Sequence, residues 1–270
     1  MKIFINTDLE GIAGFVNPAE FEVDTGRGAI HTKELLTDEV NAAISGASSV
    51  FPGAEFVVLD GHGGGWAGSN ILVEKLDPSA KLIHGKRMKE IVGLDDSFDL
   101  FFDIGHHAMA GTQYANLSHT ISMNDIYNFY INDIKVGEIG IVAMIAGYYG
   151  VPVGLVTGDY WATLEAKELF STFESFPETV AVKKGINQYS AECLNPTVAC
   201  KLIYEAAAKA VTRIGEFKPI PPNQISEVKV QFMLTTSADK AEGKGAERID
   251  GRTVVFRGKD LMETFNLFYA

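Results

Sequence analysis

The stretch that decides the fold is Lys2-Ile3-Phe4-Ile5-Asn6-Thr7, which runs directly into Asp8-Leu9-Glu10-Gly11. Its apolar residues fall on both alternating faces, which is typical of a central strand in a sheet covered by helices on both sides. Residues 55–60 (EFVVLD) and 99–105 (DLFFDIG) repeat this pattern, and between the first two strands apolar residues recur every three or four positions over 31–50. Strands that alternate with helices predict an α/β fold with a largely parallel sheet flanked by helices.

Further apolar runs predict the remaining elements. The clearest helix follows Asn195, a favourable N-cap, and has Pro196 in its first turn. Its predicted buried stripe consists of Val198, Leu202, Ala206 and Ala210, with Ile203 and Val211 beside it. The other expected elements are strands over 81–84, 127–134, 152–157, 179–182, 228–234 and 254–257, and helices over 138–149, over 162–170 and from 260 onward.

The chain is expected to divide into two parts. Residues 218–222 (KPIPP) are the clearest linker, and the last 50 residues resemble an α+β appendage. We therefore predict a catalytic α/β domain over 1–190 and a smaller C-terminal lobe, a helix plus an α+β portion, over 191–270.

The composition excludes several classes of protein. The chain has 270 residues, of which 23 are basic and 35 acidic, giving a net charge of −12. A hydrophobic content of 46% with 21% charged residues is ordinary for a globular protein. The acidic balance argues against broad binding to nucleic acid. Cys193 and Cys200 are too few for a disulfide framework or a cysteine-rich zinc site, so we expect a reduced, cytoplasmic protein.

Neither a signal peptide nor a membrane span is expected. The first apolar run has three residues, whereas a signal peptide needs about 7–15. Residues 139–158 carry no charge but are interrupted by Gly147, Gly150 and Pro152. A buried helix followed by a buried strand accounts for this segment better than a membrane-spanning helix.

Polar groups that can bind a ligand follow three of the predicted strands. In open α/β sheets, ligands bind beyond the carboxyl ends of the strands. Asp8-Leu9-Glu10 follows the first strand, Asp60-Gly61-His62 the second and Gly105-His106-His107 the fourth. Residues two apart in extended backbone point the same way, so Asp8 and Glu10 share a side, whereas at most one of the two adjacent histidines is a ligand.

These side chains fit a metal site. Glu138, at the start of the apolar helix, adds a further carboxylate. Carboxylates and imidazoles without thiolates suit zinc or manganese, especially as a pair of ions bridged by a carboxylate. Such a pair activates water as a nucleophile at neutral pH. We expect no functional role for His31, which lies at a polar helix start, or for His84, which lies beside Lys86 and Arg87.

The ordered motifs of the chain resemble the D-aminopeptidase family typified by the dipeptide-operon enzyme, peptidase family M55. The similarity runs from residue 1 to about 205 and continues more weakly through the helix near 260. Its motifs are Asp8-Leu9-Glu10-Gly11-Ile12-Ala13-Gly14, Asp60-Gly61-His62, Gly105-His106-His107-Ala108, Leu117-Ser118-His119-Thr120 and residues 129–138 (FYINDIKVGE).

The resemblance implies a binuclear zinc centre. Carried over position by position, the metal ligands of the family fall on Asp8, which bridges both ions, and on Glu10, His62, His107 and Glu138. The catalytic histidine falls on His119, acting either as a nucleophile or as an acid and base. The chain departs from the family at Gly61, where a serine is common, and at His106, where an aromatic residue is usual.

The resemblance also implies what the protein acts on and how it assembles. We expect a metallo-aminopeptidase with two Zn²⁺ per subunit, other divalent metals being possible, that releases N-terminal, D-configured amino acids from short peptides. A ring-like homo-oligomer is expected as well. Asp60 and Asp159 are candidate anchors for the free amine of the substrate, although Asp60 could equally orient His62.

Parts of the sequence also fit three other functions. Residues 63–68 (GGGWAG) match a dinucleotide-binding fingerprint, but that motif belongs after the first strand. Residues 62–65 (HGGG) mimic an oxyanion loop, but the chain has no Gly-x-Ser-x-Gly motif for a serine hydrolase. A peptide-binding or sensor protein that keeps the metal pocket without hydrolysis stays open as the alternative.

Overall fold

The computed structural model describes residues 1–19, 27–65, 68–86, 91–221 and 226–270. Within these residues, seven strands form the main sheet in the order β3-β2-β1-β4-β7-β8-β9. All neighbours are parallel except β9, which pairs antiparallel with β8. The strands are β1 (Lys2–Thr7), β2 (Glu55–Asp60), β3 (Ala80–Ile83), β4 (Leu100–His106), β7 (Val153–Asp159), β8 (Glu178–Asn187) and β9 (Ser190–Cys193). The predicted α/β class with a largely parallel sheet is confirmed.

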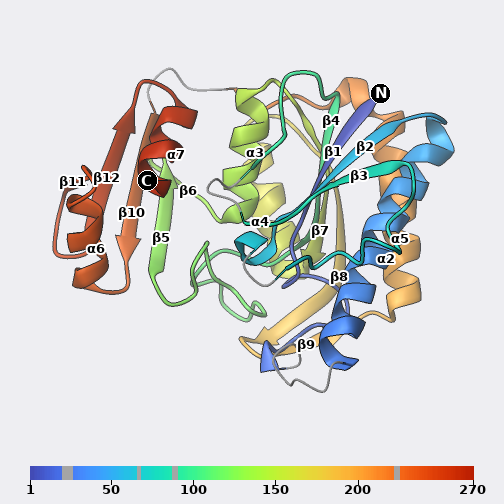
Figure 1. Cartoon of the computed structure of the whole chain (residues 1–270), viewed down its shortest axis with the longest axis horizontal. Coiled ribbons are helices and arrows are strands. Elements are labelled where there is room, and N and C mark those ends of the chain that lie inside the picture. Colours follow the sequence, from blue (N-terminus) through green and yellow to red (C-terminus); the bar gives the residue numbers. More distant parts are fainter. Residues whose placement is uncertain (20–26, 66–67, 87–90, 222–225) are drawn as a thin grey trace.

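Helices cover both faces of the main sheet (Figure 1). Helices α2 (Arg27–Val50) and α5 (Pro196–Thr212) lie on one face, and α3 (Glu138–Tyr148) and α4 (Tyr160–Ser171) on the other. The alternation of β1 serves both layers, because Ile3 and Ile5 pack in the cluster of α2 and α5 while Phe4 packs in the cluster of α3 and α4. Every residue of β4 and β7 is buried, as expected for central parallel strands.

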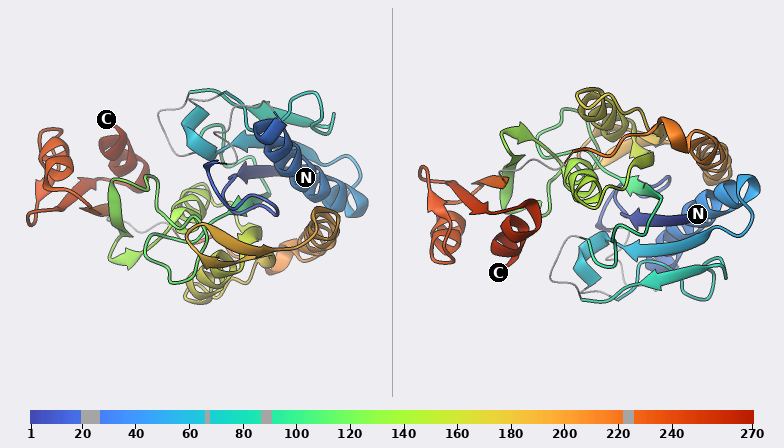
Figure 2. Two further views of the ribbon diagram at one scale, coloured as in Figure 1. Left: turned by 90° about the horizontal axis from the view of Figure 1, so that it is seen from below. Right: turned by 90° about the horizontal axis from the view of Figure 1, so that it is seen from above.

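A second, antiparallel sheet lies beside this three-layered body (Figure 2). Among the described residues it has five strands in the order β11-β12-β10-β5-β6. It carries α6 (Thr235–Glu242) and α7 (Leu261–Tyr269). The strands are β5 (Ile126–Ile131), β6 (Ile134–Lys135), β10 (Ser226–Phe232), β11 (Glu247–Arg248) and β12 (Thr253–Gly258).

The two sheets do not follow the predicted boundary between residues 190 and 191. β5 and β6 come from the middle of the chain but pair with the C-terminal strands. Conversely, α5 was assigned to the C-terminal lobe, but it packs with α2 on the main sheet. The division into domains over 1–190 and 191–270 remains a prediction, because strand pairing alone does not define domains.

Several local predictions need correction. The strand expected over 127–134 is a hairpin, since Asn132 and Asp133 turn the chain with φ of 48° and 66°. The short elements β9, β11 and α6 were not predicted. Part of the predicted linker, Pro222, lies outside the described residues. No helix in the described part of the chain is both long and apolar enough to cross a membrane.

The buried face of α5 is shifted by one residue from the predicted stripe. Asn195 caps the helix by accepting from Thr197 N, as predicted, but Val198 is 46% exposed and Leu202 is 37% exposed. The buried residues are Ala199, Ile203, Ala207, Ala210 and Val211. The reason is the close approach of α2, where a Cβ at Gly46 would lie 2.2 Å from Tyr204 O. At this point of closest approach there is no room for a side chain at Gly46, whereas Ile203 and Val211 pack elsewhere along the buried face.

Candidate metal centre

The predicted site lies at one edge of the main sheet, where three neighbouring strands in the middle of the sheet end. β1 lies between β2 and β4, and its register pairs Thr7 with both Asp60 and Ile104. Because the three strands are parallel, their carboxyl ends meet at this edge. The residues that follow them are Asp8 and Glu10 after β1, His62 at the start of the 3₁₀ helix η1 (His62–Gly65) after β2, and His107 after β4.

Glu138 and His119 reach the same edge from other parts of the chain. Glu138 is the first residue of α3, and His119 lies in the connection between β4 and β5. The backbone N–H of Ile121 donates to Glu138 Oε1 at 2.7 Å, which ties this connection to the start of α3.

One half of the site consists of Asp8, Glu10 and His62. Nδ1 of His62 lies 3.1 Å from Asp8 Oδ1 and 2.6 Å from Glu10 Oε2. The Asp8 side chain is 6% exposed and that of His62 is 24% exposed. The pair Asp8 and Glu10 therefore shares a side, as their spacing predicts, and meets the histidine from the neighbouring strand.

The other half consists of His107, Glu138 and His119. Nε2 of His107 lies 3.2 Å from Glu138 Oε1 and 3.6 Å from Asp8 Oδ2, so Asp8 lies between both halves. Nε2 of His119 is 3.7 Å from Glu138 Oε1, and its ring stacks on that of His107 with centroids 3.9 Å apart. The structure thus brings all six predicted residues together.

The donor atoms of this cluster fit a metal. Oδ2 of Asp8, Oε2 of Glu10 and Nε2 of His107 are buried and have no hydrogen-bond partner within the described structure. Oε2 of Glu10 lies 2.6 Å from His62 Nδ1, and Oδ2 of Asp8 lies 3.6 Å from His107 Nε2, but neither contact has the geometry of a hydrogen bond. An unpaired buried polar atom costs about 1–3 kcal/mol, which a cation bound among the three would offset. The sets Asp8, Glu10, His107 and His107, His119, Glu138 each offer ligand atoms within 4.8 Å of one another.

The hydrogen bonds of two histidines leave one ring nitrogen of each available. Nδ1 of His107 lies 2.9 Å from Ala108 O, and Nδ1 of His119 lies 2.8 Å from Leu117 O. A carbonyl oxygen only accepts, so both Nδ1 atoms donate. This leaves the lone pair of Nε2 for a metal or a proton on the side where Glu138 lies.

The carboxylates and imidazoles of the cluster stabilise each other's charged forms. Burial alone would lower the pKa of His107, but Glu138 and Asp8 raise it to about 10. Burial also opposes the charged form of His62, yet Glu10 and Asp8 raise its pKa well above the usual value. The pKa of Asp8 would be raised by burial but is held well below its usual value by His62 and His107. Cations are therefore strongly favoured between these carboxylates.

His106 faces away from this cluster, as expected for the neighbour of a ligand histidine in extended backbone. Its Nε2 lies 2.9 Å from Asp103 Oδ1 and 3.2 Å from Asn6 Nδ2. Burial opposes protonation, but Asp103 raises the pKa of His106 to about 9. His106 is thus a buried, ion-paired support beneath the site.

Gly61, where the chain departs from the family, lies at a close approach of two strands. A Cβ at this position would lie 2.2 Å from Thr7 O, and Gly61 N donates to that same oxygen. Strands β1 and β2 therefore approach each other closely beside His62, and a side chain here requires a backbone shift.

Neither suggested anchor for the substrate amine has an unoccupied carboxylate. Asp60 accepts from Asn70 N at 2.6 Å and from Asn70 Nδ2 at 2.9 Å. Asp159 caps α4 and also accepts from Asn116 N and Gly185 N. Asp60 holds the loop after β2, since Asn70 Nδ2 also donates to His62 O.

The connection around His119 has unusual backbone conformations. Leu117 and Ile121 have φ of 51° and 61°, a region that residues other than glycine rarely adopt. Such backbone persists only where the surroundings enforce it. Here the enforcing contacts are the bonds of Ile121 N to Glu138 and of His119 N to Ala108 O at 3.3 Å.

Lys183 supports the site, although no sequence pattern predicted this role. It lies on β8, is 2% exposed, and its Nζ donates to Glu10 O at 2.5 Å, Phe15 O at 2.5 Å and Asn116 Oδ1 at 2.8 Å. Burial lowers its pKa to about 8. Lys183 thus fixes the backbone of Glu10 across 173 residues of chain, a link that no local motif reveals.

Replacing Lys183 with methionine is expected to loosen the loop that carries Glu10. The three acceptors lose their donor, so unfolding free energy should fall by about 3 kcal/mol or more. Zinc affinity should fall roughly 10–100-fold, the usual effect of losing a group that orients a ligand. Urea unfolding and a competition titration with a zinc chelator measure these effects. Lys184→Met is the control, because Lys184 is exposed; equal zinc affinity in Lys183→Met and the parent protein would contradict this role.

The buried carboxyl group of Glu39 should make the free energy of unfolding depend on pH, and one substitution should remove this dependence. It is 2% exposed, accepts from Ala13 N at 2.9 Å, and burial raises its pKa from 4.5 to about 8. Between these values the unfolded chain loses this proton while the folded chain keeps it, so stability falls as pH rises from about 4.5 to 8. Glu39→Gln should lack this loss, which is on the order of 3 kcal/mol. Urea unfolding at pH 5 and pH 8 compares the two proteins, and identical changes in both would contradict the assignment.

The two histidines for which no functional role is expected lie on the surface. His31 and His84 are exposed, and His31 lies 3.9 Å from Glu34. Cys193 and Cys200 are free thiols that are only partly buried. Of the residues in the fingerprint-like stretch 63–68, Trp66 and Ala67 lie outside the described residues.

Known proteins resemble the chain over its whole length. The family model Peptidase_M55, described as D-aminopeptidase, matches residues 1–270. The D-aminopeptidase of Bacillus subtilis (strain 168) is 36% identical over 270 residues, which are 98% of this chain and 94% of that protein. A solved structure of the Zn-dependent D-aminopeptidase DppA from Bacillus subtilis, described as a self-compartmentalizing protease, matches with a TM-score of 0.89 and 35% identity. That match covers 99% of this chain and 95% of the other.

Proposed function

The chain belongs to the D-aminopeptidase family Peptidase_M55, a family of peptide-bond hydrolases, and from this premise we propose that it is a binuclear zinc aminopeptidase. Its proposed reaction is the release of an N-terminal, D-configured amino acid from a short peptide. The DppA relative is Zn-dependent, which supports zinc as the metal.

The observation that carries the proposal is the convergence of six residues from five parts of the chain. Asp8 has one oxygen 3.1 Å from His62 Nδ1 and the other 3.6 Å from His107 Nε2, which supports a role as a ligand shared by two ions. A single-ion site would not require a carboxylate between two imidazoles.

Five residues are proposed to hold two ions. Glu10 and His62 would hold one ion and His107 and Glu138 the other, with Asp8 shared between them. When bound, the zinc pair supplies Lewis-acid polarisation of the scissile carbonyl and lowers the pKa of water.

His119 is proposed to move the protons of the reaction. Because Nδ1 donates to Leu117 O, the ring is held with Nε2 as its free base. Nε2 lies 3.7 Å from Glu138 Oε1, next to one of the residues proposed to hold the ions. His119 would take a proton from the attacking water at Nε2 and deliver it to the leaving amine, a role that contributes about 10²–10⁴-fold to a rate.

Assembly is proposed by similarity. The DppA relative is described as self-compartmentalizing, which supports a homo-oligomer of this chain with sites facing an enclosed space. A ring is the form that we propose, and a cytoplasmic location remains a prediction from composition.

Hydrolysis of defined dipeptides tests the function. The zinc-loaded chain should release D-alanine from D-Ala-D-Ala and should act far more slowly on L-Ala-L-Ala. Free amino acid is quantified by chromatography, with the chelator-treated chain as the control. Binding of D-Ala-D-Ala without any released alanine would contradict the proposal and favour the sensor alternative.

A further inference from the structure

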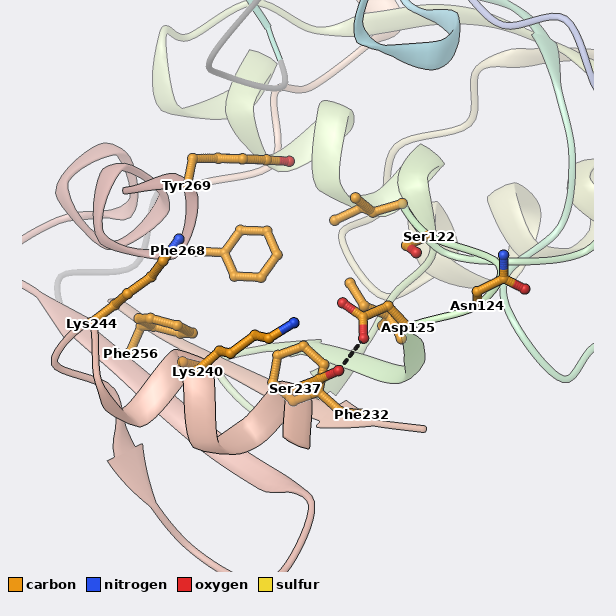
Figure 3. A pocket seen from close by; sticks show the side chains of 13 residues that line it. Ser122, Asn124, Asp125, Phe232, Ser237, Lys240, Lys244, Phe256, Phe268 and Tyr269 are labelled. Atoms are coloured by element: carbon orange, nitrogen blue, oxygen red, sulfur yellow. Dashed lines mark hydrogen bonds between the residues drawn. The ribbon is translucent and has the colours of Figure 1, made fainter. Parts of the chain in front are cut away.

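Apart from the metal centre, the structure has a cavity of about 610 Å³ between the small sheet and the connection that follows His119 (Figure 3). We refer to it as the α6–α7 cavity. Its volume lies within the range of small-molecule sites. It is lined by Ile121, Ser122, Asn124, Asp125, Ile126, Phe232, Ser237, Lys240, Ala241, Lys244, Phe256, Phe268 and Tyr269.

Three aromatic side chains give the α6–α7 cavity an apolar wall. Phe232 and Phe256 are 6% and 3% exposed and come from strands of the small sheet, while Phe268 comes from α7. Figure 3 shows the ring of Phe268 extending into the cavity. An apolar group of a ligand can therefore bury against these rings.

Two lysines provide positive charge beside this wall. Lys240 lies on α6 and Lys244 two residues beyond its end, and both side chains extend toward the cavity (Figure 3). Among the described residues neither lysine forms an ion pair. Asp125 also lines the cavity and accepts a hydrogen bond from Ser237 Oγ, so two ammonium groups stand against one carboxylate and the lining remains net positive. In a chain of net charge −12, two unpaired ammonium groups at one apolar cavity favour an anionic ligand.

The α6–α7 cavity adjoins the metal centre through one residue. The Ile121 side chain lines the cavity, while its backbone N–H donates to Glu138 Oε1. Of the next residues, Ser122, Asn124, Asp125 and Ile126 also line the cavity. Asp125 O in turn accepts from Met233 N at 2.8 Å, so the wall is fixed at both ends.

We propose that the α6–α7 cavity binds a small amphipathic carboxylate, with the carboxylate on the ammonium groups of Lys240 and Lys244 and the apolar part on the three phenylalanines. Such a molecule has two possible sources: an amino acid or peptide with its free amine, or a carboxylate without an amine. Binding does not depend on hydrolysis, so this proposal can fail or succeed independently of the proposed function.

Calorimetric titration of the zinc-loaded chain with 4-phenylbutyrate and with its neutral amide tests the charge requirement. The acid is expected to bind at least about tenfold more tightly than the amide, because a charge-assisted contact is worth 1.4 kcal/mol or more. Repeating the titration with D-phenylalanine distinguishes the two sources, because this ligand has a free amine and 4-phenylbutyrate has none. Tighter binding of D-phenylalanine would indicate an amino acid or peptide, and tighter binding of 4-phenylbutyrate a carboxylate without an amine.

Substitutions locate the binding. Lys240→Met and Lys244→Met should each weaken 4-phenylbutyrate binding several-fold, the double variant at least about tenfold, and Phe268→Ala should weaken acid and amide alike. Lys201→Met, an exposed lysine of α5 whose side chain is 74% exposed, is the matched control and should bind as the parent does. Equal affinity for acid and amide, unchanged binding in the double lysine variant, or no binding because a second copy of the chain covers the cavity would each overturn the proposal.

Discussion

Asp8→Ala is expected to remove most of the bound zinc and to reduce the rate of dipeptide hydrolysis by about 10³-fold or more. Asp8 is the only predicted ligand that contacts histidines of both halves, at 3.1 Å from His62 and 3.6 Å from His107. Losing it removes a negative charge that both ions would share. A 10³-fold rate loss equals roughly 4 kcal/mol of charge stabilisation, which is the scale of metal-ion catalysis.

The measurements are zinc per chain after dialysis and kcat/KM for D-Ala-D-Ala. Zinc content should fall from two per chain to one or fewer. Asp99→Asn is a control, because Asp99 is 53% exposed at the opposite end of β4 and should change neither quantity. Full zinc content in Asp8→Ala would contradict the assignment of Asp8 as the shared ligand.

His119→Ala is expected to abolish most turnover while leaving two zinc ions bound. Its Nε2 is the free base of the site, and loss of a general acid and base costs about 10²–10⁴-fold in kcat. The pH dependence of kcat should also change, which a purely structural role of His119 would not produce. Zinc per chain and the pH dependence of kcat measure both parts of the prediction.

The zinc content of His119→Ala tests whether His119 is a ligand, because His107, His119 and Glu138 could also hold one ion together. If His119→Ala loses an ion as well as activity, His119 is a ligand and the proposed division between ligands and catalyst is wrong. His31→Ala is the matched control, because His31 is an exposed histidine of α2 and should affect neither zinc nor rate.

The main sheet was predictable because its strands carry their pattern locally. The run Ile3-Phe4-Ile5 serves two helical layers, and this is visible from the sequence alone. The errors fall where pairing is non-local or where packing is unusually close. One strand partner of β5, β10, lies about 100 residues later, and α5 buries Ala199 and Ala207 where the sequence pattern favoured Val198 and Leu202.

The metal centre was predictable in part for the same reason. Asp8, Glu10, His62 and one of the two adjacent histidines follow from strand ends and from alternation. Choosing His107, and adding His119, depended on the resemblance to the family. Lys183 was missed because its three bonds join β8 to segments more than 60 residues away. A buried lysine in a strand leaves no sequence pattern that distinguishes it from its exposed neighbour Lys184.

Anomalous scattering at the zinc edge, from crystals of the zinc-loaded chain, tests the central claim most directly. Two peaks are predicted, one next to Glu10 and His62 and the other next to His107 and Glu138, with an oxygen of Asp8 close to each. A single peak, or peaks remote from these five side chains, would contradict the binuclear cage on which the proposed hydrolysis depends.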